Sequence, residues 1–380
     1  MRLISRNNFP VKRVVISVTT DLVTDQRVHR AALTLHEASY NVTVIGRRQK
    51  KSLPLPPQVY STKRMKLFFE RGPLFYMFFN LRLFLFLMFK RADILYSNDL
   101  DTLLPNFIAS KLKHCELIYD CHEYFTGIPE LKNRPAVRGI WKSIERFIFP
   151  KLKTIITVND SLAKVYSEEY NKKVFVVRNL PLTPNKNVQP KTKKDFHLPE
   201  KKLIIFQGAG INIDRGAEEA LVAMHYVPDA VLAFVGSGDV IPKLKRKTAD
   251  ENMSDKVFFI DKLQPEKLRQ LTRLAEIGLT LDKDTNINYR FSLPNKLFDY
   301  IHAGVPVLAS PLPEVAAIVK GYDIGATIDN HSPKHIAAKI NSMLGDEVQI
   351  KKWKQNLERA ALELNWEKEK EKFLLLFKNI

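Results

Sequence analysis

Short runs of β-branched residues alternate with longer segments whose apolar residues recur every three or four positions, and the chain repeats this rhythm twice. In the first half we predict a helix at 25–38 and strands at 14–18, 41–45, 94–96, 117–119, 155–157 and 174–177. In the second half we predict strands at 203–206, 231–235, 257–260, 277–281 and 305–308. Strands that alternate with helices are typical of parallel, doubly wound sheets. The pattern therefore predicts an α/β protein with two Rossmann-like domains.

A stretch rich in proline, lysine and polar residues, 179–199, divides the two halves and has the composition of a linker. At 380 residues, 45% of them hydrophobic, the chain is long enough to form two cores of ordinary size. We therefore expect an N-terminal domain at 1–182 and a C-terminal domain at 183–362.

The chain is strongly basic, with a formal net charge of +19. Residues 1–180 carry 30 Lys and Arg against 15 Asp and Glu, whereas residues 181–380 carry 30 against 26, so the excess lies in the first half. A basic domain suits nucleic acid, anionic lipid or an anionic sugar substrate. The sequence has no RNA-binding aromatic motif, zinc finger or basic heptad region, and we therefore expect no nucleic-acid partner.

The two cysteines, Cys115 and Cys121, lie on either side of a predicted strand and lack the spacing of a zinc site. We expect both to be reduced thiols in a cytoplasmic protein. Residues 1–10 contain basic residues without an apolar stretch, so we expect no secretory signal there.

The most apolar run of the chain, 67–89, is interrupted by Asn80 and Arg82 and falls short of a membrane span. Two interpretations remain open. The run is a helix packed against the first sheet, or part of its surface also meets lipid, because it is apolar nearly all round. Flanking cations would then attract anionic headgroups: Lys63, Arg64, Lys66, Arg71, Lys90 and Arg91.

Residues 288–308 form a polar loop, a short helix and an apolar strand. Arg290 and Lys296 bring positive charge to the start of the helix, where free backbone N–H groups also favour an anion. Asp299 lies three residues after Lys296, so the pair suits a phosphate and a ribose hydroxyl, although an ordinary surface ion pair has the same spacing. The full order, with Asn295 before Lys296 and Ala303-Gly304-Val305-Pro306 after Asp299, is more specific. It resembles the donor-site segment of retaining glycosyltransferases of family 4.

The resemblance implies a GT-B fold, in which two Rossmann-like domains face a cleft. It implies a nucleoside-diphosphate sugar as donor, with no cofactor beyond this substrate. The C-terminal segment 363–380, with Trp366, Phe373 and Phe377 in apolar helical positions, resembles the family's final helix, which crosses back onto the first domain.

A second segment, 206–216, follows a predicted strand and precedes a helix. Gly208, Gly210 and Gly216 would let the backbone approach a pyrophosphate, and Arg215 would supply charge. The segment resembles the family's pyrophosphate element, although Ala209 stands where a basic residue is usual. The resemblance also implies nucleotide contacts at four further positions, namely Gly236, Gly238, Lys262 and Leu263.

In the first half, Asp120-Cys121-His122-Glu123 follows a predicted strand, at the edge where doubly wound sheets expose their chemistry. A structural histidine is the alternative. The four residues resemble the family's D-x-H-E element, which implies that His122 holds a donor-sugar hydroxyl and that Glu123 orients the acceptor or His122. Acceptor contacts are expected from Asp21, from Arg27, whose Asp-x-Arg-Val context resembles a subgroup of the family, and from Asp99.

Two departures from the family pattern matter. Phe291 stands where many relatives carry a sugar-binding Glu, eight residues before the ribose carboxylate, so backbone groups or Arg290 are expected to read the sugar. Two D-x-D triplets, at Asp99 and at Asp282, are typical of metal sites. Because Lys283 opposes a cation and Arg and Lys supply the charge, we expect no metal requirement.

The sequence thus predicts a glycosyltransferase that moves a sugar from a nucleotide sugar to a saccharide or lipid-linked acceptor, with retention implied by the family. His122, Glu123, Arg215 and Lys296 are its expected catalytic residues. We expect it in the cytoplasm, with peripheral association at the anionic inner face of the cell membrane. The alternatives are a nucleotide-sugar 2-epimerase of the same fold and a non-catalytic basic protein that binds membrane or nucleic acid.

Overall fold

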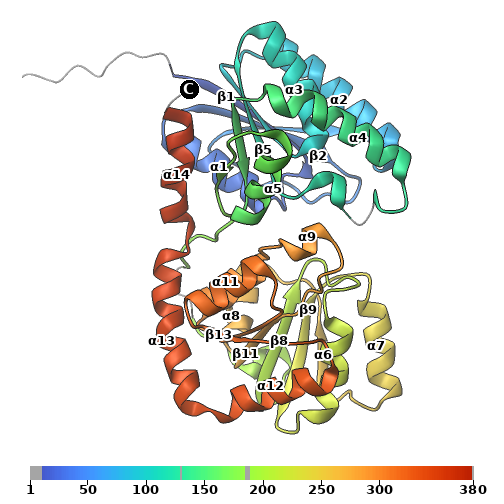
Figure 1. The fold of residues 1–380 in the computed structure, drawn as a ribbon, viewed down its shortest axis with the longest axis vertical. Coiled ribbons are helices and arrows are strands. Elements are labelled where there is room, and N and C mark those ends of the chain that lie inside the picture. The colour runs from blue at the N-terminus through green and yellow to red at the C-terminus, as the bar shows by residue number, and fades with distance from the viewer. Residues whose placement is uncertain (1–10, 129–130, 185–188, 379–380) are drawn as a thin grey trace, which may run out of the picture. The chain divides into compact units, whose positions relative to one another are not determined.

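The computed structural model describes residues 11–128, 131–184 and 189–378, so the expectation about residues 1–10 lies outside the described residues. The chain divides into two compact units (Figure 1). Unit 1 contains the residues up to Arg178 together with those from Lys370 onward, and unit 2 contains Asn179–Glu369.

Unit 1 is built on a parallel seven-stranded sheet of order β3-β2-β1-β4-β5-β6-β7. Its strands are β1 (Arg13–Asp21), β2 (Asn41–Arg48), β3 (Ser61–Lys66), β4 (Ile94–Asn98), β5 (Glu116–Cys121), β6 (Thr154–Thr157) and β7 (Phe175–Val176). All the strands predicted for this half are present. The edge strand β3 was not predicted, because its sequence Ser-Thr-Lys-Arg-Met-Lys is polar and only Met65 is buried.

The helices of unit 1 are α1 (Gln26–Glu37), α2 (Gly72–Phe89), α3 (Leu100–Lys113), α4 (Pro135–Ile148), α5 (Asp160–Tyr170) and the later part of α14 (Trp366–Lys378). The predicted helix at 25–38 is α1, and Asp25 caps it by accepting a hydrogen bond from the backbone N–H of Val28 at 3.0 Å. Phe373 and Phe377 of α14 pack against Tyr96 of β4. This contact joins the end of the chain to the centre of the first sheet.

Unit 2 has a parallel six-stranded sheet of order β10-β9-β8-β11-β12-β13. Its strands are β8 (Lys202–Gly208), β9 (Ala230–Gly236), β10 (Val257–Ile260), β11 (Ile277–Thr280), β12 (Val307–Ala309) and β13 (Gly325–Thr327). Its helices are α6 (Ala217–Ala223), α7 (Ile241–Asp250), α8 (Pro265–Thr272), α9 (Ile287–Arg290), α10 (Asn295–Ala303), α11 (Pro313–Gly321), α12 (Pro333–Gly345) and α13 (Glu347–Glu363). The two Rossmann-like domains predicted from the sequence are thus confirmed.

The proline-rich stretch expected as a linker is more ordered than its composition suggested. Leu180 and Leu198 are buried in the core of unit 2, and Thr192 and Asp195 form a capping box around a short 3₁₀ turn. Most of its described residues therefore belong to unit 2.

Strand order reverses between β1 and β4 in unit 1, and between β8 and β11 in unit 2. Ligands of doubly wound sheets bind outside the carboxyl ends of strands at such reversals, because the connections leave in opposite directions there. The chemistry of each unit is therefore expected at these two strand edges.

Candidate active site

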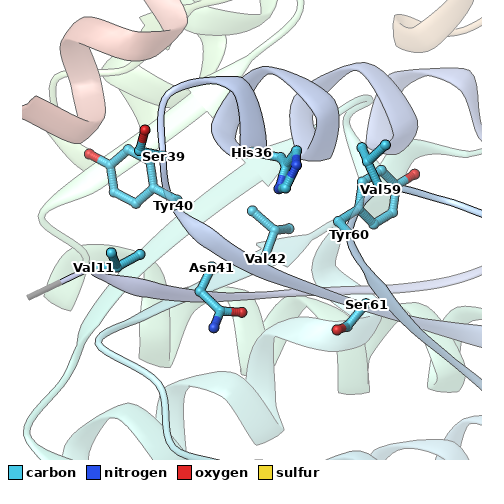
Figure 2. A pocket seen from close by; sticks show the side chains of 9 residues that line it. All are labelled: Val11, His36, Ser39, Tyr40, Asn41, Val42, Val59, Tyr60 and Ser61. Atoms are coloured by element: carbon cyan, nitrogen blue, oxygen red, sulfur yellow. The ribbon is translucent and has the colours of Figure 1, made fainter.

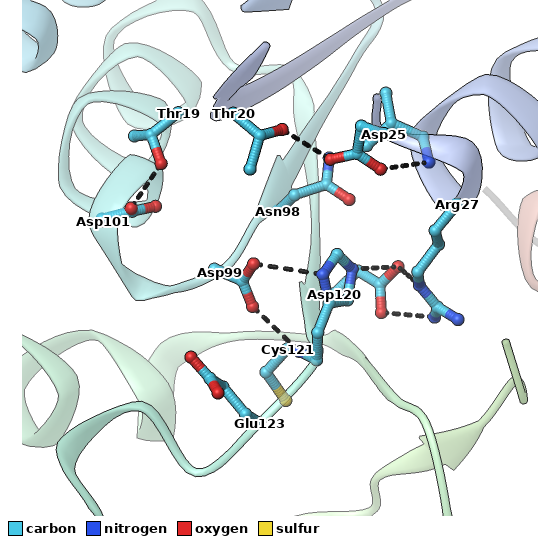
Figure 3. Close-up of polar contacts among 12 residues, drawn as sticks. Thr19, Thr20, Asp25, Arg27, Asn98, Asp99, Asp101, Asp120, Cys121 and Glu123 are labelled. Atoms are coloured by element: carbon cyan, nitrogen blue, oxygen red, sulfur yellow. Dashed lines mark hydrogen bonds and ion pairs between the residues drawn. The ribbon is translucent and has the colours of Figure 1, made fainter. Parts of the chain in front are cut away.

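Polar side chains gather at the carboxyl ends of β1, β4 and β5, next to the reversal in unit 1 (Figure 3). Asp21 ends β1, Asp99 follows β4, and Asp120 lies near the end of β5, two residues before His122. Because these strands are parallel neighbours, residues about 100 positions apart in the sequence come together here.

His122 lies between two carboxylates. Its Nδ1 is 3.1 Å from Oδ2 of Asp99, and its backbone N–H donates to Oδ1 of the same residue at 2.9 Å. Its Nε2 is buried and lies 3.3 Å from Oδ2 of Asp120, an ion-pair distance without hydrogen-bond alignment. Burial lowers the pKa of His122, but Asp99 and Asp120 outweigh burial and raise it to about 10. His122 is therefore an imidazolium at neutral pH.

The backbone of Asp99 adopts φ 58° and ψ 166°, a region that residues other than glycine rarely occupy. The strained residue starts α3 and directs its carboxylate to His122. Backbone strain of this kind concentrates at functional sites, where surrounding contacts hold it. The strain therefore supports a functional role for the contact between Asp99 and His122.

Asp120 is fully buried and accepts three hydrogen bonds from two side chains. The guanidinium of Arg27 binds it through two hydrogen bonds, of 3.0 and 2.7 Å, and the hydroxyl of Tyr96 donates to it at 2.6 Å. Burial alone would raise the pKa of Asp120, but Arg27 and His122 hold it well below its usual range. Asp120 therefore stays ionised beside His122.

Arg27, which was expected to contact the acceptor, is buried and has other partners in this structure. Arg27 is 6% exposed, and its third nitrogen donates to the backbone oxygen of Val177 at 3.0 Å. With its donors directed at Asp120 and Val177, Arg27 holds the carboxylate that faces His122.

Asp21, the other expected acceptor contact on this edge, is paired with Arg64. Both carboxylate oxygens accept from one guanidinium nitrogen at 2.9 Å, and the side chains of Asp21 and Arg64 are only 11% and 12% exposed. The pair joins β1 to β3 across the sheet. Asp21 therefore stabilises the sheet edge, and Arg64 is not free to bind lipid headgroups as expected.

Asp99 and Asp101, the first D-x-D triplet, have different partners (Figure 3). Asp101 is buried and accepts a hydrogen bond of 2.5 Å from the hydroxyl of Thr19, whereas Asp99 contacts His122. Burial, with a smaller contribution from Asp99, raises the pKa of Asp101 to about 7. The two carboxylates of the triplet are therefore directed at different partners, Thr19 and His122.

In unit 2, the loops after β8 and β9 bind each other tightly. Ser237 N–H donates to Gly208 O at 3.2 Å, and Ile211 N–H donates to Ser237 O at 2.9 Å. Gly236 has φ +124°, and a Cβ there would lie 2.0 Å from Gly208 O. Gly210 and Gly238 lie in the same pair of loops. The glycines thus allow a close backbone pairing beside the strand reversal.

Arg215 and Lys296 converge on Asp282, which directly follows Leu281 at the end of the β11 region. A guanidinium nitrogen of Arg215 lies 3.2 Å from one carboxylate oxygen, and Nζ of Lys296 lies 3.9 Å from the other. Asp282 is 1% exposed, and within the described chain neither oxygen has a hydrogen-bond partner. Arg215 also stacks 4.1 Å from the ring centre of Tyr289, and Lys296 lies 4.5 Å from that of Phe206.

Two cations are therefore held close together at the carboxyl edge of the second sheet. Burial lowers the pKa of Lys296, Arg215 lowers it further, and Asp282 opposes both. Lys283, which was expected to oppose a metal at Asp282, instead pairs with Glu219 at 2.6 Å. The cations facing Asp282 come from the loop before α6 and from α10.

The remaining residues expected to bind the donor differ in their partners. Asp299 accepts a hydrogen bond of 2.9 Å from Gln207, which ends the β8 region and is itself held by Thr272 at 2.7 Å. Asn295 accepts from Asn179 at 3.0 Å. Arg290 is 53% exposed and turns to Asp284 at 2.8 Å rather than toward Lys296.

Four further expected residues lie on loops or at the start of a helix. Lys262 is exposed and Leu263 partly buried after β10, and Gly216 starts α6 with φ +79°. On the other unit, Glu123 is exposed beside His122. Asp299, Lys296 and Arg215 thus lie near the ends of β8 and β11, while Arg290 points elsewhere.

Sequence reasoning gave Asp120, Tyr96 and Gln207 no roles, and it considered Asp282 only as a metal ligand. Asp120 could have been found from its place at a strand end two residues before His122. Tyr96 and Gln207 carry no signal of their own, because each acts through a partner distant in the sequence.

A separate cavity of about 420 Å³ lies at the amino ends of β2 and β3 (Figure 2). Its lining residues are Val11, His36, Ser39, Tyr40, Asn41, Val42, Val59, Tyr60 and Ser61. Asn41 and Ser61 begin their strands, so the cavity lies at the edge of the sheet opposite His122. It is not part of the candidate site.

Comparisons with known proteins agree with this fold. Residues 25–180 match the family described as Glycosyltransferase Family 4, and residues 188–360 match Glycosyl transferases group 1. Among curated proteins, the chitobiosyldiphosphodolichol beta-mannosyltransferase of Candida glabrata is 21% identical over 253 residues, or 57% of this chain and 55% of that protein. The chain therefore spans about half the length of this relative.

Similar solved structures cover nearly the whole chain. Sucrose-phosphate synthase from Thermosynechococcus elongatus is 15% identical with a TM-score of 0.76, covering 97% of this chain and 98% of its own. A glycosyltransferase from Rickettsia africae is 14% identical with a TM-score of 0.76, covering 98% and 99%. Anabaena HepE, solved in complex with UDP and glucose, is 10% identical with a TM-score of 0.75, covering 97% and 100%.

At these identities the structural likeness is one of fold, and that fold is GT-B. The two family matches extend over most of the chain, one in each half. The first half of the chain therefore carries a family 4 domain and the second half a group 1 domain, both of them glycosyltransferase domains.

Proposed function

We propose that this protein transfers a sugar from a nucleoside-diphosphate sugar to a lipid-linked saccharide acceptor, with retention at the anomeric carbon. The observation that carries the donor assignment is the convergence of Arg215 and Lys296 at the strand reversal of unit 2. Two cations held together beside a pair of glycine-containing loops suit a diphosphate.

In this proposal Lys296 and Arg215 bind the diphosphate and Asp299 binds the ribose. Gly208, Gly210, Gly236 and Gly238 let the backbone approach the nucleotide. Asp282 is taken to keep the two cations close together before the donor arrives. HepE, solved with UDP and glucose, supports a nucleotide ligand for this fold.

Sugar transfer breaks the bond between the anomeric carbon and the diphosphate, and negative charge grows on the leaving group. Cations already in place stabilise that charge without the cost of reorganising water. Because Arg215 and Lys296 supply this charge, we propose that no metal ion is required. Arg215 and Lys296 then contribute most in the transition state.

On unit 1 we propose a different role for His122 from the one the family resemblance implied. Its Nδ1 faces Asp99 and its buried Nε2 faces Asp120, so neither ring nitrogen is offered to a sugar hydroxyl. A general base needs a free nitrogen. We propose that His122 acts as a fixed positive charge, and that the exposed Glu123 is the residue of this loop that meets the acceptor.

The proposed acceptor class is supported by the name of the Candida glabrata relative, which includes chitobiosyldiphosphodolichol, a saccharide joined to a lipid through a diphosphate. A lipid-linked acceptor is met at a membrane surface, and we propose that this surface is the cytoplasmic face. The same name specifies a beta-mannosyltransferase, so the anomeric outcome has to be measured directly.

The test begins with binding of UDP-, GDP- and ADP-sugars, scored by calorimetry. The donor that binds is then incubated with lipid-linked and soluble acceptors, with and without EDTA, and the product anomer is read by NMR. We expect acceptor-dependent release of nucleoside diphosphate that persists in EDTA, and an anomer that matches the donor. Isomerisation of the donor without acceptor would instead identify an epimerase, and absence of any donor binding would refute catalysis.

A further inference from the structure

Helix α2 of unit 1 is apolar on two opposite sides. One side is buried in the core of unit 1 and consists of residues at every fourth position, Phe75, Phe79, Leu83 and Leu87. The other side is between 38% and 54% exposed and consists of Leu74, Met77, Phe78, Leu81 and Leu85. With about 3.6 residues per turn, these two sets fall on opposite faces of the helix. We call the exposed set the α2 stripe.

Fully exposed aromatic side chains extend the α2 stripe at both ends. Phe68, just before the helix, is 98% exposed, and Phe89, its last residue, is 88% exposed. Phe69 stacks on Phe78 with ring centres 5.6 Å apart. Large apolar side chains gathered in this way are uncommon on a protein surface that faces only water. The exposed α2 stripe therefore indicates a surface that binds an apolar partner.

Among the described residues, α2 is the one helix long and apolar enough to cross a membrane. It has 18 residues and a mean hydropathy of 1.6, and 22% of this segment is buried inside the protein. Its contacts nevertheless tie it to unit 1. Asn80 donates to the backbone oxygen of Asp101 at 2.9 Å, and Arg82 donates to that of Lys66 at 2.6 Å. A span would also pull Phe79 and Leu83 out of the core. The helix therefore suits a position along a bilayer surface rather than across it.

The charge around α2 indicates that the bilayer surface it suits is anionic. Residues 61–91 contain seven Lys and Arg but a single acidic residue, Glu70. Arg64 is paired with Asp21, but exposed cations remain near both ends of the helix, namely Lys63, Lys66, Arg71, Lys90 and Arg91. An apolar stripe with cations at both ends complements a bilayer that carries anionic headgroups.

We infer that unit 1 docks on an anionic lipid bilayer through α2. The helix lies in the plane of the surface, the α2 stripe enters the boundary between headgroups and acyl chains, and the flanking cations meet lipid phosphates. The inference deepens the proposed function, because a lipid-linked acceptor would be met at this surface. Docking itself requires no sugar transfer, so it can be tested without a donor.

The test is co-sedimentation of the full chain with vesicles of phosphatidylcholine alone or mixed with phosphatidylglycerol, at low and high salt. We expect at least about 10-fold stronger binding to the anionic vesicles at low salt, and weaker binding at high salt because salt screens the headgroup charge. A Phe89→Trp variant should show a blue-shifted emission that lipids with brominated chains quench.

Variants test the stripe and the charge separately. Exchanging three stripe residues, M77Q, L81Q and L85Q, should lower binding about 10-fold or more. The matched control exchanges three exposed apolar residues elsewhere, V348Q, L362Q and L375Q, which are 82%, 72% and 55% exposed. The charge variant K66Q, R71Q and K90Q should reduce binding and its salt dependence, whereas the control K243Q, K351Q and K354Q should not.

Circular dichroism establishes that each variant is folded. The inference is wrong if wild type stays in the supernatant with anionic vesicles at low salt, or if the stripe variant binds as well as wild type. A concentration-dependent dimer in light scattering that the stripe variant abolishes, without vesicle binding, would show that a second copy covers the stripe instead. Nucleotide binding, measured in parallel, tests the proposed function independently of these outcomes.

Discussion

Asp99 contacts His122 through both oxygens of its carboxylate. One oxygen accepts a hydrogen bond from the backbone N–H of His122 at 2.9 Å, and the other lies 3.1 Å from Nδ1 of the His122 ring. The contact joins the end of β4 to the end of β5, and it requires Asp99 to adopt a backbone conformation that costs energy. The fold holds Asp99 in this unfavourable conformation with its carboxylate beside His122. We therefore expect Asp99 to influence the charge of His122.

Replacing Asp99 by Asn should lower the pKa of His122 from about 10, because it removes one of the two carboxylates that raise this pKa. Asn has the same shape as Asp, and its side-chain oxygen can still accept the backbone N–H of His122, so the contact that holds the backbone should be retained. The measurement is an NMR titration of the His122 ring. An unchanged pKa would show that Asp120 alone determines the charge.

The same group should make stability depend on pH. His122 has a raised pKa in the folded state, so its contribution is complete below about pH 6.5 and is lost as the pH rises through about 10. Urea unfolding of wild type and His122→Gln across this window should show a difference that shrinks with rising pH. A constant difference would contradict the imidazolium assignment.

Removing one cation of the proposed donor site should impair turnover strongly. Arg215→Ala or Lys296→Ala should lower kcat/KM by about 10²-fold or more, the scale of losing one preorganised charge contact. Arg290→Ala is the matched control, because Arg290 is half exposed and paired with Asp284. Near-normal kcat/KM in both site variants, or equal loss in the control, would refute the assignment of the site.

Asp101→Asn should stabilise the protein relative to wild type as the pH rises. The folded-state pKa of Asp101 is raised to about 7, so its favourable contribution is lost between about pH 4 and pH 7. The variant has no such loss, and its unfolding free energy relative to wild type should increase by about 2–4 kcal/mol over that range. Chemical denaturation at pH 4.5 and pH 8 measures this, and a difference independent of pH would contradict the burial of an ionisable group.

Gly236→Ala should destabilise unit 2. The residue has φ +124°, and a Cβ would meet Gly208 O at 2.0 Å, so the conformation alone should cost about 1–3 kcal/mol and the clash more. Gly139→Ala is the control, since Gly139 lies within α4 with nothing near its Cβ position, and it should stabilise by about 0.5–1 kcal/mol. Thermal unfolding of both variants checks this, and a neutral Gly236→Ala would show that the loops after β8 and β9 can separate.

Local patterns accounted for most of the fold. The strand Val257–Ile260 and the helix capped by Asp25 follow from residue types a few positions apart, since side-chain periodicity and capping are local properties. The polar strand β3 (Ser61–Lys66) could not be predicted in this way, because it is a strand through its pairing with β2.

The sequence by itself determined the alternation of strands and helices, and placed Arg215, Lys296 and Asp299 near strand ends. Only the tertiary structure decided which charges meet. Arg27 and Asp120 are 93 residues apart in sequence and form a buried pair. Arg64 and Asp21 are 43 apart and form a partly buried pair, so the carboxylate or guanidinium of each expected acceptor contact is already bound within the protein. An ion pair depends on the order of strands in the sheet and on burial, and neither is encoded in the spacing of residues along the chain.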